Sequence, residues 1–376
     1  MKPVLLAALL AAALAAPAQA QTKLQMQSAF PPKGTFADNL VFFAERVKVM
    51  SGGRLEIVPI PTGSIVPAFE VLDATHKKVI DGAHSSSAYW VGKNRAAALF
   101  GVTPGGPFGM DGFDYMGWLY DGGGMELYRE LFQVVLQRNV VPIPMTSAGP
   151  QALGWFKRPV KNWADFKGLK CRQTGISAEV FTRSGMTTVN MAGGEIVPSA
   201  QRGVIDCAEW VGPSDDMIMG FHQVWKHFYT QSSHDLSLLE ILINGDVWKA
   251  LTPDLQAIVQ AATIEATLRS QNRRNRLDAA ALVELQTKHN VRIHRTPNDI
   301  LKKMLEAWDE IAKEEAAKNP FFKKVYDSQR AYASQVVTSR LITAPSVSPT
   351  TSRSTPMPSS STTGNRPSIR RVVPSL

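Results

Sequence analysis

Two stretches of the chain alternate between predicted strands and predicted helices, and this alternation limits the fold more than any other feature. The first stretch has predicted strands at residues 23–30, 55–60 and 83–87. Between the first two strands, apolar residues recur on one face of a predicted helix, at Phe36, Leu40, Phe43 and Val47. Strand–helix–strand order favours a parallel sheet covered by helices.

A second stretch repeats this order after residue 150. Its strands are predicted at residues 168–173, 187–191 and 204–210. Helices are predicted between them, at residues 177–184 and 195–201. Two such units in one chain of 376 residues predict an α/β fold with two lobes and a cleft between them.

Residues 253–289 contain no glycine and no interior proline, and they predict one long helix. At 1.5 Å per residue this helix would extend about 55 Å, which is long enough to brace both lobes. The alternative is two helices with an unmarked break. Within this stretch, Arg273, Arg274 and Arg276 are expected to form a solvent-exposed helix face.

The N-terminus is typical of a secretory signal peptide, predicted at residues 1–20. Lys2 precedes an apolar run from Val4 to Ala16, and Ala18-Gln19-Ala20 offers a small-residue cleavage site. The apolar run is shorter than the ~20 residues that span a bilayer. The alternative is a buried N-terminal helix. The signal reading predicts an exported, periplasmic protein.

Residues 343–376 are rich in Ser, Thr and Pro, and we expect them to be disordered. They hold four arginines and no acidic residue, at Arg353, Arg366, Arg370 and Arg371. The whole chain has a formal net charge of +9, so without these arginines and Lys2 the folded body keeps about +4. This modest excess predicts no nucleic-acid partner.

The predicted elements divide the folded body into two lobes. The first lobe is expected to comprise residues 21–148 plus about 236–270. The second is expected to comprise residues 149–235 plus about 271–342. Within the first lobe lies a glycine-rich stretch around residues 105–112, which either lines the cleft or simply connects two elements.

Sequence motifs of common enzymes are absent. The chain contains no G-x-S-x-G, H-E-x-x-H, C-x-x-C, Walker or G-x-G-x-x-G motif. Two strand ends of the second unit carry polar residues instead, with Arg172 on one and Glu209-Trp210 on the other. Ligands of open α/β sheets bind at such strand ends.

Arg172 offers a planar fork of donors that suits a carboxylate, although a surface salt bridge is an equal alternative. Trp210 either forms a wall of the cleft or packs in the core. Glu209 would repel an anionic ligand by about 4 kcal/mol at 4 Å and an effective dielectric constant near 20. A hard cation shared by Glu209 and the ligand would offset this repulsion.

At these residues the chain resembles the solute-binding subunits of TRAP (tripartite ATP-independent periplasmic) transporters of the DctP type. It is most similar to the branch of α-keto-acid and lactate binders, sometimes labelled mannitol/chloroaromatic. The resemblance covers about residues 23–340. It rests on the segments Ser51–Arg54, Ser87–Lys93, Pro107–Met110, Lys167–Arg172 and Ala208–Pro213.

The resemblance implies an α/β, periplasmic binding protein-like fold, with two lobes around a ligand cleft and a long helix bracing both. It implies that Arg172 clamps the substrate carboxylate. Glu209 by its side chain and Trp210 by its backbone carbonyl would hold a metal ion, and Gln151 would contact both metal and substrate. Tyr89 would line the cleft from the first lobe.

Asp235 stands where relatives often have a glutamate as a further metal ligand, and it is shorter by one methylene group. The implied ligand is a small 2-oxo or 2-hydroxy monocarboxylate held with sodium or calcium. The implied partner is the membrane permease of a TRAP transporter, to which the protein delivers this carboxylate. The resemblance also allows a homodimer.

Three features depart from the family pattern. Residues 173–177 replace a stretch that is usually rich in Ile, Pro and Gly, and they would reshape the pocket beside Arg172. Cys171 and Cys207 would lie on adjacent strands. We expect buried free thiols there, because neighbouring parallel strands rarely give disulfide geometry, and a disulfide is the alternative. The tail after residue 343 would affect any dimer contact of a C-terminal helix.

Two other functions use the same cleft. A ligand-binding sensor that signals to a membrane receptor would have the same lobes. An exported enzyme with metal-assisted chemistry at Glu209 would need an open metal position and a nearby base, and the sequence offers no convincing base. The leading hypothesis is a binding protein that returns its ligand unchanged.

Overall fold

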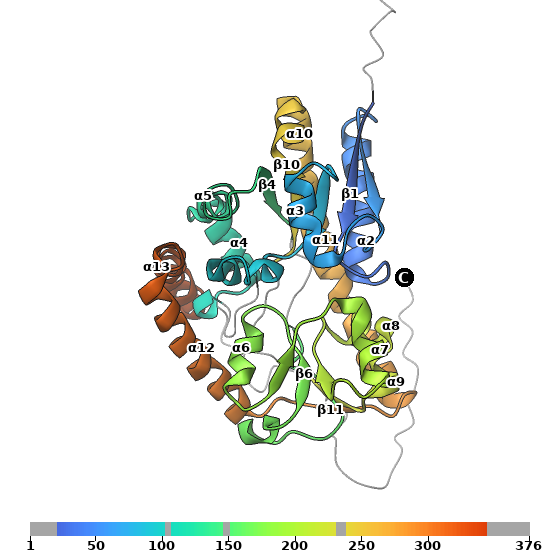
Figure 1. Cartoon of the computed structure of the whole chain (residues 1–376), viewed down its shortest axis with the longest axis vertical. Helices are drawn as coiled ribbons and strands as arrows, with labels where there is room; N and C mark the ends of the chain where they lie inside the picture. The colour runs from blue at the N-terminus through green and yellow to red at the C-terminus, as the bar shows by residue number, and fades with distance from the viewer. Residues whose placement is uncertain (1–20, 102–106, 146–150, 231–237, 344–376) are drawn as a thin grey trace, which may run out of the picture.

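The computed structural model describes residues 21–101, 107–145, 151–230 and 238–343. These residues form two α/β lobes, each built on one sheet, and the predicted fold class is confirmed (Figure 1). The predicted signal peptide and all of the predicted tail except Thr343 lie outside the described residues, as do residues 102–106 of the glycine-rich stretch.

The first lobe contains a five-stranded sheet in the order β2-β1-β3-β10-β4. Its strands are β1 (Thr22–Ser28), β2 (Leu55–Ile60), β3 (Gly82–Ser85), β4 (Val140–Pro144) and β10 (Glu240–Asn244). β1 pairs in parallel with β2 and β3, as the strand–helix alternation predicts. β10 is antiparallel to both neighbours, since the chain re-enters this sheet from the second lobe.

The second lobe contains a six-stranded sheet in the order β11-β9-β5-β8-β6-β7. Its strands are β5 (Gly154–Phe156), β6 (Lys170–Arg172), β7 (Thr187–Val189), β8 (Cys207–Ala208), β9 (His227–Tyr229) and β11 (Arg292–His294). β6 lies between β7 and β8 and is parallel to both. β5 runs antiparallel to β8 and β9, which the parallel-sheet expectation missed.

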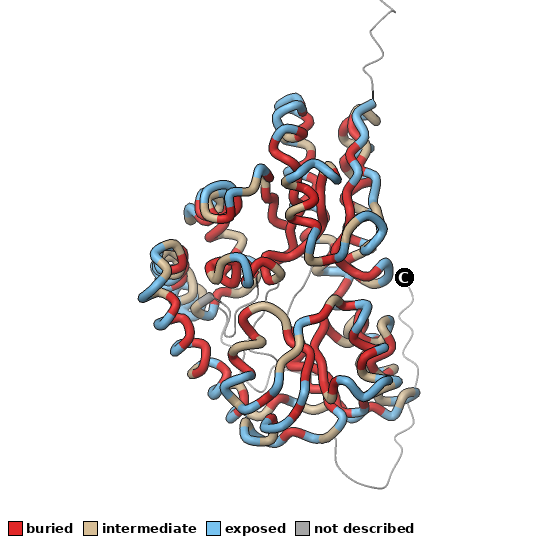
Figure 2. Tube along the Cα trace, viewed as in Figure 1, coloured by how far each residue is buried: buried red, intermediate tan, exposed pale blue. Residues whose placement is uncertain are grey.

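Shorter helices cover these sheets. In the first lobe they are α2 (Thr35–Met50), α3 (Val71–His76), α4 (Gly112–Tyr120), α5 (Gly124–Glu130) and α10 (Gly245–Ala250). In the second lobe they are α6 (Ser177–Thr182), α7 (Ile196–Gln201), α8 (Pro213–Met219) and α9 (Phe221–Val224). Figure 2 shows most residues of the sheet strands as buried. One buried cluster lies within the first lobe, and another joins residues of both lobes, such as Val71 and Trp90 with Phe156 and Ile300.

One uninterrupted helix, α11 (Pro253–Thr287), packs against α2 of the first lobe and α8 of the second. The predicted long helix that contacts both lobes is therefore confirmed, and the alternative of two helices with a break between them is wrong. Arg46 of α2 forms an ion pair of 2.7 Å with Glu265 of α11. At the second lobe, Asp278 of α11 accepts a hydrogen bond of 3.0 Å from the Ser214 backbone N–H.

Arg274 corrects the expectation that Arg273, Arg274 and Arg276 all face solvent. Its side chain is buried, and its Nε donates to Asp278 at 3.2 Å. Asp278 also accepts from the Ser214 hydroxyl, so Arg274 neutralises the carboxylate that joins α11 to α8. Charge runs on helices usually lie in solvent, whereas α8, which is distant in the sequence, packs against α11 here.

The last two helices, α12 (Asn298–Lys318) and α13 (Pro320–Thr343), lie along the side of both lobes (Figure 1). α12 packs on α6 of the second lobe. α13 instead packs against α4 and α5 of the first lobe, where Lys324 pairs with Glu130 at 2.6 Å. The contacts of α13 thus lie on the first lobe, whereas residues 271–342 are predicted to belong to the second lobe. The other domain boundaries stay predictions.

Cys171 of β6 and Cys207 of β8 form a disulfide. The expectation of free thiols was wrong. In the β6–β8 register these residues lie directly opposite each other, with a Cα–Cα distance of 4.6 Å, which is within the range that disulfides span. The bond joins the two strands whose ends carry Arg172 and Glu209.

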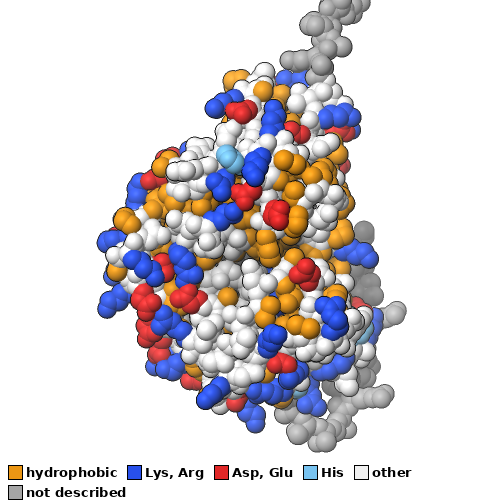
Figure 3. Space-filling view, in the orientation of Figure 1, with side chains coloured by type: hydrophobic (Ala, Val, Ile, Leu, Met, Phe, Trp, Pro, Cys, Tyr) orange, Lys and Arg blue, Asp and Glu red, His pale blue; other side chains and the backbone are white. Residues whose placement is uncertain are grey.

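None of the helices among the described residues combines the length and the apolar character needed to cross a bilayer. On the face shown in Figure 3, basic and acidic side chains are interspersed over both lobes. The body therefore presents no continuous patch of one charge sign on that face.

Removing the disulfide should destabilise the second lobe. It closes a loop with a sequence separation of 36 residues, for which the loss of chain entropy in the unfolded state gives a stabilisation of about 2–4 kcal/mol. We expect the variant Cys171→Ala/Cys207→Ala to lower the free energy of unfolding in urea by this amount. A thiol-reactive dye should find no free thiol in the denatured, non-reduced wild-type protein. Labelling of two thiols would contradict the bond.

Candidate functional site

Arg172 and Glu209 lie side by side because β6 and β8 are parallel neighbours. Arg172 is the last residue of β6 and pairs in register with Ala208 of β8. Glu209 follows Ala208 directly, so both charged residues lie at the same edge of the sheet, at the carboxyl ends of their strands. The sequence analysis placed both residues at strand ends, and the parallel register of β6 and β8 brings these ends together.

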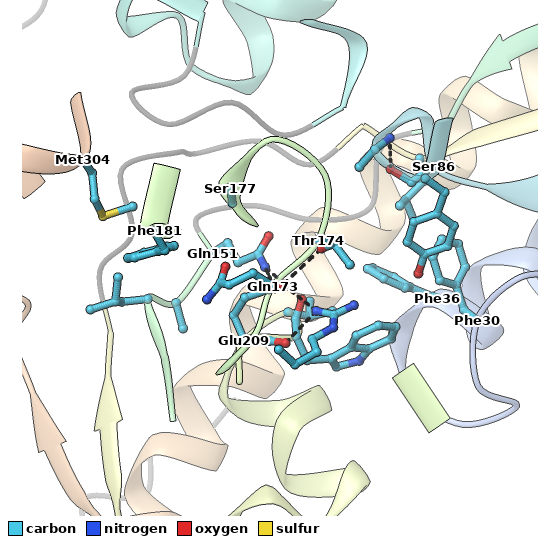
Figure 4. A pocket seen from close by; sticks show the side chains of 18 residues that line it. Phe30, Phe36, Ser86, Gln151, Gln173, Thr174, Ser177, Phe181, Glu209 and Met304 are labelled. Atoms are coloured by element: carbon cyan, nitrogen blue, oxygen red, sulfur yellow. Dashed lines mark hydrogen bonds and ion pairs between the residues drawn. The ribbon is translucent and has the colours of Figure 1, made fainter. Parts of the chain in front are cut away.

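The two side chains form a buried ion pair. Arg172 Nη1 donates to Glu209 Oε1 at 2.5 Å and to the Glu209 backbone carbonyl at 2.7 Å, and Nε donates to the Met191 carbonyl at 3.3 Å. Figure 4 shows Glu209 at the centre of the pocket's hydrogen bonds. Only 1% of Arg172 is exposed to solvent, so the alternative of a surface salt bridge is wrong. The guanidinium carbon lies 5.4 Å from the Trp210 ring centroid, which adds a cation–π contact.

Glu209 has two further side-chain partners. The Thr174 hydroxyl donates to Oε1 at 3.1 Å, and Gln151 Nε2 donates to Oε2. Burial raises the pKa of Glu209 above its ordinary value, while the positive charge of Arg172 acts in the opposite direction. Arg172, Thr174 and Gln151 therefore offset only part of the desolvation of this carboxyl group.

Gln151, Glu209 and Trp210 bring oxygen ligands together. Gln151 Nε2 lies between the Glu209 carboxylate and the Trp210 backbone carbonyl, to which it donates at 2.9 Å. A position between these two oxygens favours positive charge. With the amide turned so that its oxygen faces inward, the three groups offer a carboxylate, a carbonyl and an amide oxygen, a donor set that suits a hard cation such as sodium or calcium.

Other metal chemistry has little support in the described part of the chain, where no group of three or more His, Cys, Asp or Glu side chains is placed to hold a metal ion. Asp235, the remaining predicted metal ligand, lies outside the described residues. Its role stays a prediction.

The first lobe closes the pocket with aromatic side chains. Phe30, Phe36 and Tyr89 line it, and the Trp210 ring lies 6.0 Å from Phe36. Trp210 is 9% exposed and belongs to a cluster of buried side chains that also contains Phe30 and Trp155, so it forms a pocket wall and packs in the core as well. Burial raises the pKa of Tyr89 to about 12, so its phenol stays protonated and can donate.

A buried carboxylate holds the segment that carries Tyr89. Glu240 of β10 accepts from the Ser87 hydroxyl at 2.5 Å, from Trp90 Nε1 at 2.7 Å and from the Tyr128 hydroxyl. Ser87 and Trp90 are the ends of the short 3-10 helix Ser87–Trp90, so both sides of Tyr89 are fixed. Burial raises the pKa of Glu240.

Asp216 of α8 does the same for the loop after Glu209-Trp210. It accepts from the backbone N–H groups of Val211 at 3.1 Å and Gly212 at 3.2 Å, and from Trp155 Nε1 at 2.8 Å. Asp216 is fully buried and fixes the backbone of Val211 and Gly212. The two residues before them, Glu209 and Trp210, line the pocket.

Direct contacts join the two lobes around the pocket. Asp215 of α8 accepts from the Thr35 backbone N–H at 2.6 Å and from the Thr35 hydroxyl at 2.7 Å, and so caps α2 from the opposite lobe. Gly34 has a φ of +99°, and a Cβ there would lie 2.4 Å from Asp215 Oδ1. Arg95 pairs with Glu179 across the lobes. The lobes are therefore closed over the pocket.

The structure brings Arg172, Gln151, Tyr89, Glu209 and Trp210 to one pocket, as predicted, although their individual roles stay predictions. Several lining residues were not singled out by sequence: Phe30, Phe36, Ser86, Leu153, Phe181, Leu239 and Met304. Met304 comes from α12, more than 90 residues beyond Glu209, and no local pattern marks it. Gln173, Thr174 and Ser177 lie in the stretch that departs from the family pattern, and this was their only signal.

Comparison with known proteins gives the class of this chain. The model of the bacterial extracellular solute-binding proteins of family 7, DctP, matches residues 26–319. The chain belongs to this family, and the resemblance noted in its sequence is confirmed.

Relatives with known ligands lie in the same family. The chain is 34% identical over 294 residues to the monocarboxylate 2-oxoacid-binding periplasmic protein of Nostoc sp. strain PCC 7120, covering 78% of this chain and 79% of the relative. Two crystal structures of TRAP periplasmic solute-binding proteins have TM-scores of 0.80 and cover 86% of this chain. The Colwellia psychrerythraea protein, with calcium and pyruvate, is 30% identical over 98% of its length; the Pseudoalteromonas atlantica T6c protein, with sodium and pyruvate, is 29% identical over 97%.

Proposed function

We propose that this solute-binding protein captures a small 2-oxo or 2-hydroxy monocarboxylate together with sodium or calcium, and delivers it unchanged to the membrane permease of a TRAP transporter. The observation that carries the proposal is the buried pair of Arg172 and Glu209 at the wall of a closed pocket. It is supported by the 2-oxoacid-binding relative and by the pyruvate-bound structures with calcium or sodium.

Arg172 is the group that binds the ligand carboxylate. Its Nη1 already donates to two oxygens of Glu209, and a guanidinium offers a second pair of donors in the geometry that a carboxylate needs. A carboxylate ligand therefore replaces part of the Arg172–Glu209 pairing. The cavity of about 60 Å³ that remains in the closed form favours a short acid.

The negative charge of Glu209 makes a bound cation necessary. An anion placed beside Arg172 also lies beside Glu209, and the repulsion of two such charges at 4 Å is about 4 kcal/mol. Glu209, the Trp210 carbonyl and Gln151 are the groups that would hold sodium or calcium. A bound cation supplies the positive charge that removes this repulsion.

Several observations support a binding protein that acts outside the cytoplasm. Burial keeps the Tyr89 phenol protonated, so Tyr89 donates to the ligand and does not serve as a base. Glu209, the carboxylate that lines the pocket among the described residues, is engaged with Arg172, Thr174 and Gln151. The disulfide between Cys171 and Cys207 is typical of an oxidising compartment, in agreement with the predicted signal peptide and periplasmic location.

The function is tested by a thermal-shift panel on protein freed of ligand by unfolding and refolding. A ligand at about 100 times its Kd stabilises the protein by about 2.7 kcal/mol, which is readily detected. We expect a rise in melting temperature with 2-oxo or 2-hydroxy monocarboxylates, only when sodium or calcium is present. Stabilisation by sugars or dicarboxylates without a cation would contradict the proposal.

The variant Arg172→Lys tests the role of the Arg172 guanidinium in the same thermal-shift panel. It keeps the positive charge beside Glu209 but removes the planar fork, so the shift should be lost, with at least about a tenfold loss of affinity. The control is Arg158→Lys, because the Arg158 guanidinium bonds to the Asp165 backbone carbonyl in the same lobe and does not line the pocket. Equal ligand affinity in Arg172→Lys and wild type would contradict the role of Arg172.

The affinity should also fall on acidification. Protonation of Glu209 removes the charge that a cation requires, and burial raises the pKa of this carboxyl, so binding is lost as the pH falls through that raised pKa. Titration calorimetry with pyruvate and calcium at stepwise lower pH measures this loss. Glu209→Gln should bind weakly and with little dependence on pH. A pH profile in this variant that matches the wild-type profile would contradict the assignment.

A further inference from the structure

A second amide in the pocket has no role in the ion-pair network. Gln173 follows the last residue of β6, and its backbone N–H is fixed by a 3.2 Å hydrogen bond to the Val189 carbonyl. Its side chain is only 2% exposed, yet its Oε1 has no hydrogen-bond partner in the described structure. Gln151, by contrast, uses its amide on Glu209 and Trp210.

An unpartnered buried amide oxygen is costly, because the group gives up its hydrogen bonds to water on folding. Native proteins rarely keep such a group without a reason. Gln173 lines the ligand pocket together with the apolar residues Leu153, Phe181 and Met304. Figure 4 shows Gln173, Phe181 and Met304 among the side chains of this pocket. The apolar side chains offer no donor, and no described residue bonds to Gln173 Oε1, which leaves this oxygen available to a ligand.

The required partner is a hydrogen-bond donor. A 2-oxo oxygen and an ionised carboxylate only accept, so neither end of an unsubstituted 2-oxo acid satisfies Gln173 Oε1. A hydroxyl group donates, and it also accepts from the Gln173 amide nitrogen. The carboxylate end of the ligand is assigned to Arg172, so the hydroxyl has to lie on the carbon chain of the acid. The affinities for lactate and pyruvate separate a hydroxyl on the second carbon from one further along this chain.

We propose that Gln173 is a specificity-determining residue that binds a hydroxyl on the carbon chain of the ligand, so that the preferred solute is a short hydroxylated 2-oxo monocarboxylate. This inference rests on the proposed function, since it takes the carboxylate to lie on Arg172. It narrows the substrate class within that function.

The test compares two ligands that differ only in this hydroxyl, 2-oxobutyrate and 4-hydroxy-2-oxobutyrate, by titration calorimetry with calcium. Wild type should bind the hydroxylated acid at least about tenfold more tightly, the effect of one well-formed hydrogen bond to a buried group. In Gln173→Met, which keeps the length of the side chain without its amide, the ratio of the two affinities should fall to near one. The control Gln260→Met, on the exposed face of α11, should keep the wild-type ratio.

Equal affinities for the two acids in wild type, or the same ratio in Gln173→Met and wild type, would overturn the inference. If Gln173→Met instead changes the ratio of the lactate affinity to the pyruvate affinity, Gln173 lies at the second carbon of the ligand, and the inference is overturned too. If wild type binds neither 2-oxo acid with any cation, the proposed function fails. In that case the melting temperatures of ligand-free wild type and Gln173→Met test the inference about Gln173.

Ligand-free Gln173→Met should melt at the same temperature as wild type or higher, because the variant removes an unpartnered buried amide. A melting temperature several degrees lower would mean that the amide has a structural partner, and it would overturn the inference without any ligand.

Discussion

The buried ion pair of Arg172 and Glu209 is the interaction on which the rest of the structure depends. Taking two charges out of water costs several kcal/mol per ion, and their attraction compensates only with good geometry and further hydrogen bonds. The second lobe supplies both. The parallel register of β6 and β8 places the two strand ends together, and the disulfide between Cys171 and Cys207 joins the strands one or two residues away. Asp216 fixes the loop that follows Glu209. The pair is thus held ready to exchange part of its pairing for an anion and a cation.

The first lobe excludes water from the charged side chains at the two strand ends. Its aromatic side chains cover the pair, and Glu240 holds the segment that carries Tyr89. Thr35 and Asp215 join the lobes next to the pocket, while α11 runs along both lobes. A closed pocket has a low effective dielectric constant, so charge matching and unpaired polar groups decide which solute binds. Gln173 is such a group, and this is why one amide can determine specificity.

Sequence reasoning predicted the parts of this protein that follow from local pattern. The apolar period of α2, the uninterrupted run of α11 and the two strand ends with Arg172 and Glu209 were all visible in single segments. What it missed depends on contacts between distant segments. The antiparallel entry of β5 and β10 follows from the crossing of the chain between lobes, and Arg274 is buried because α8 brings Ser214 to Asp278. The disulfide required the strand register, and Met304 reaches the pocket from α12.

The most direct test of the central claim is anomalous X-ray scattering from calcium in crystals of the refolded protein grown with a 2-oxo monocarboxylate. The account predicts one anomalous peak bonded to the Glu209 carboxylate and to the Trp210 carbonyl oxygen. It also predicts that the ligand carboxylate lies on the Arg172 guanidinium. A carboxylate bound elsewhere in the pocket, with the Arg172–Glu209 pair intact and no anomalous peak at Glu209, would contradict it.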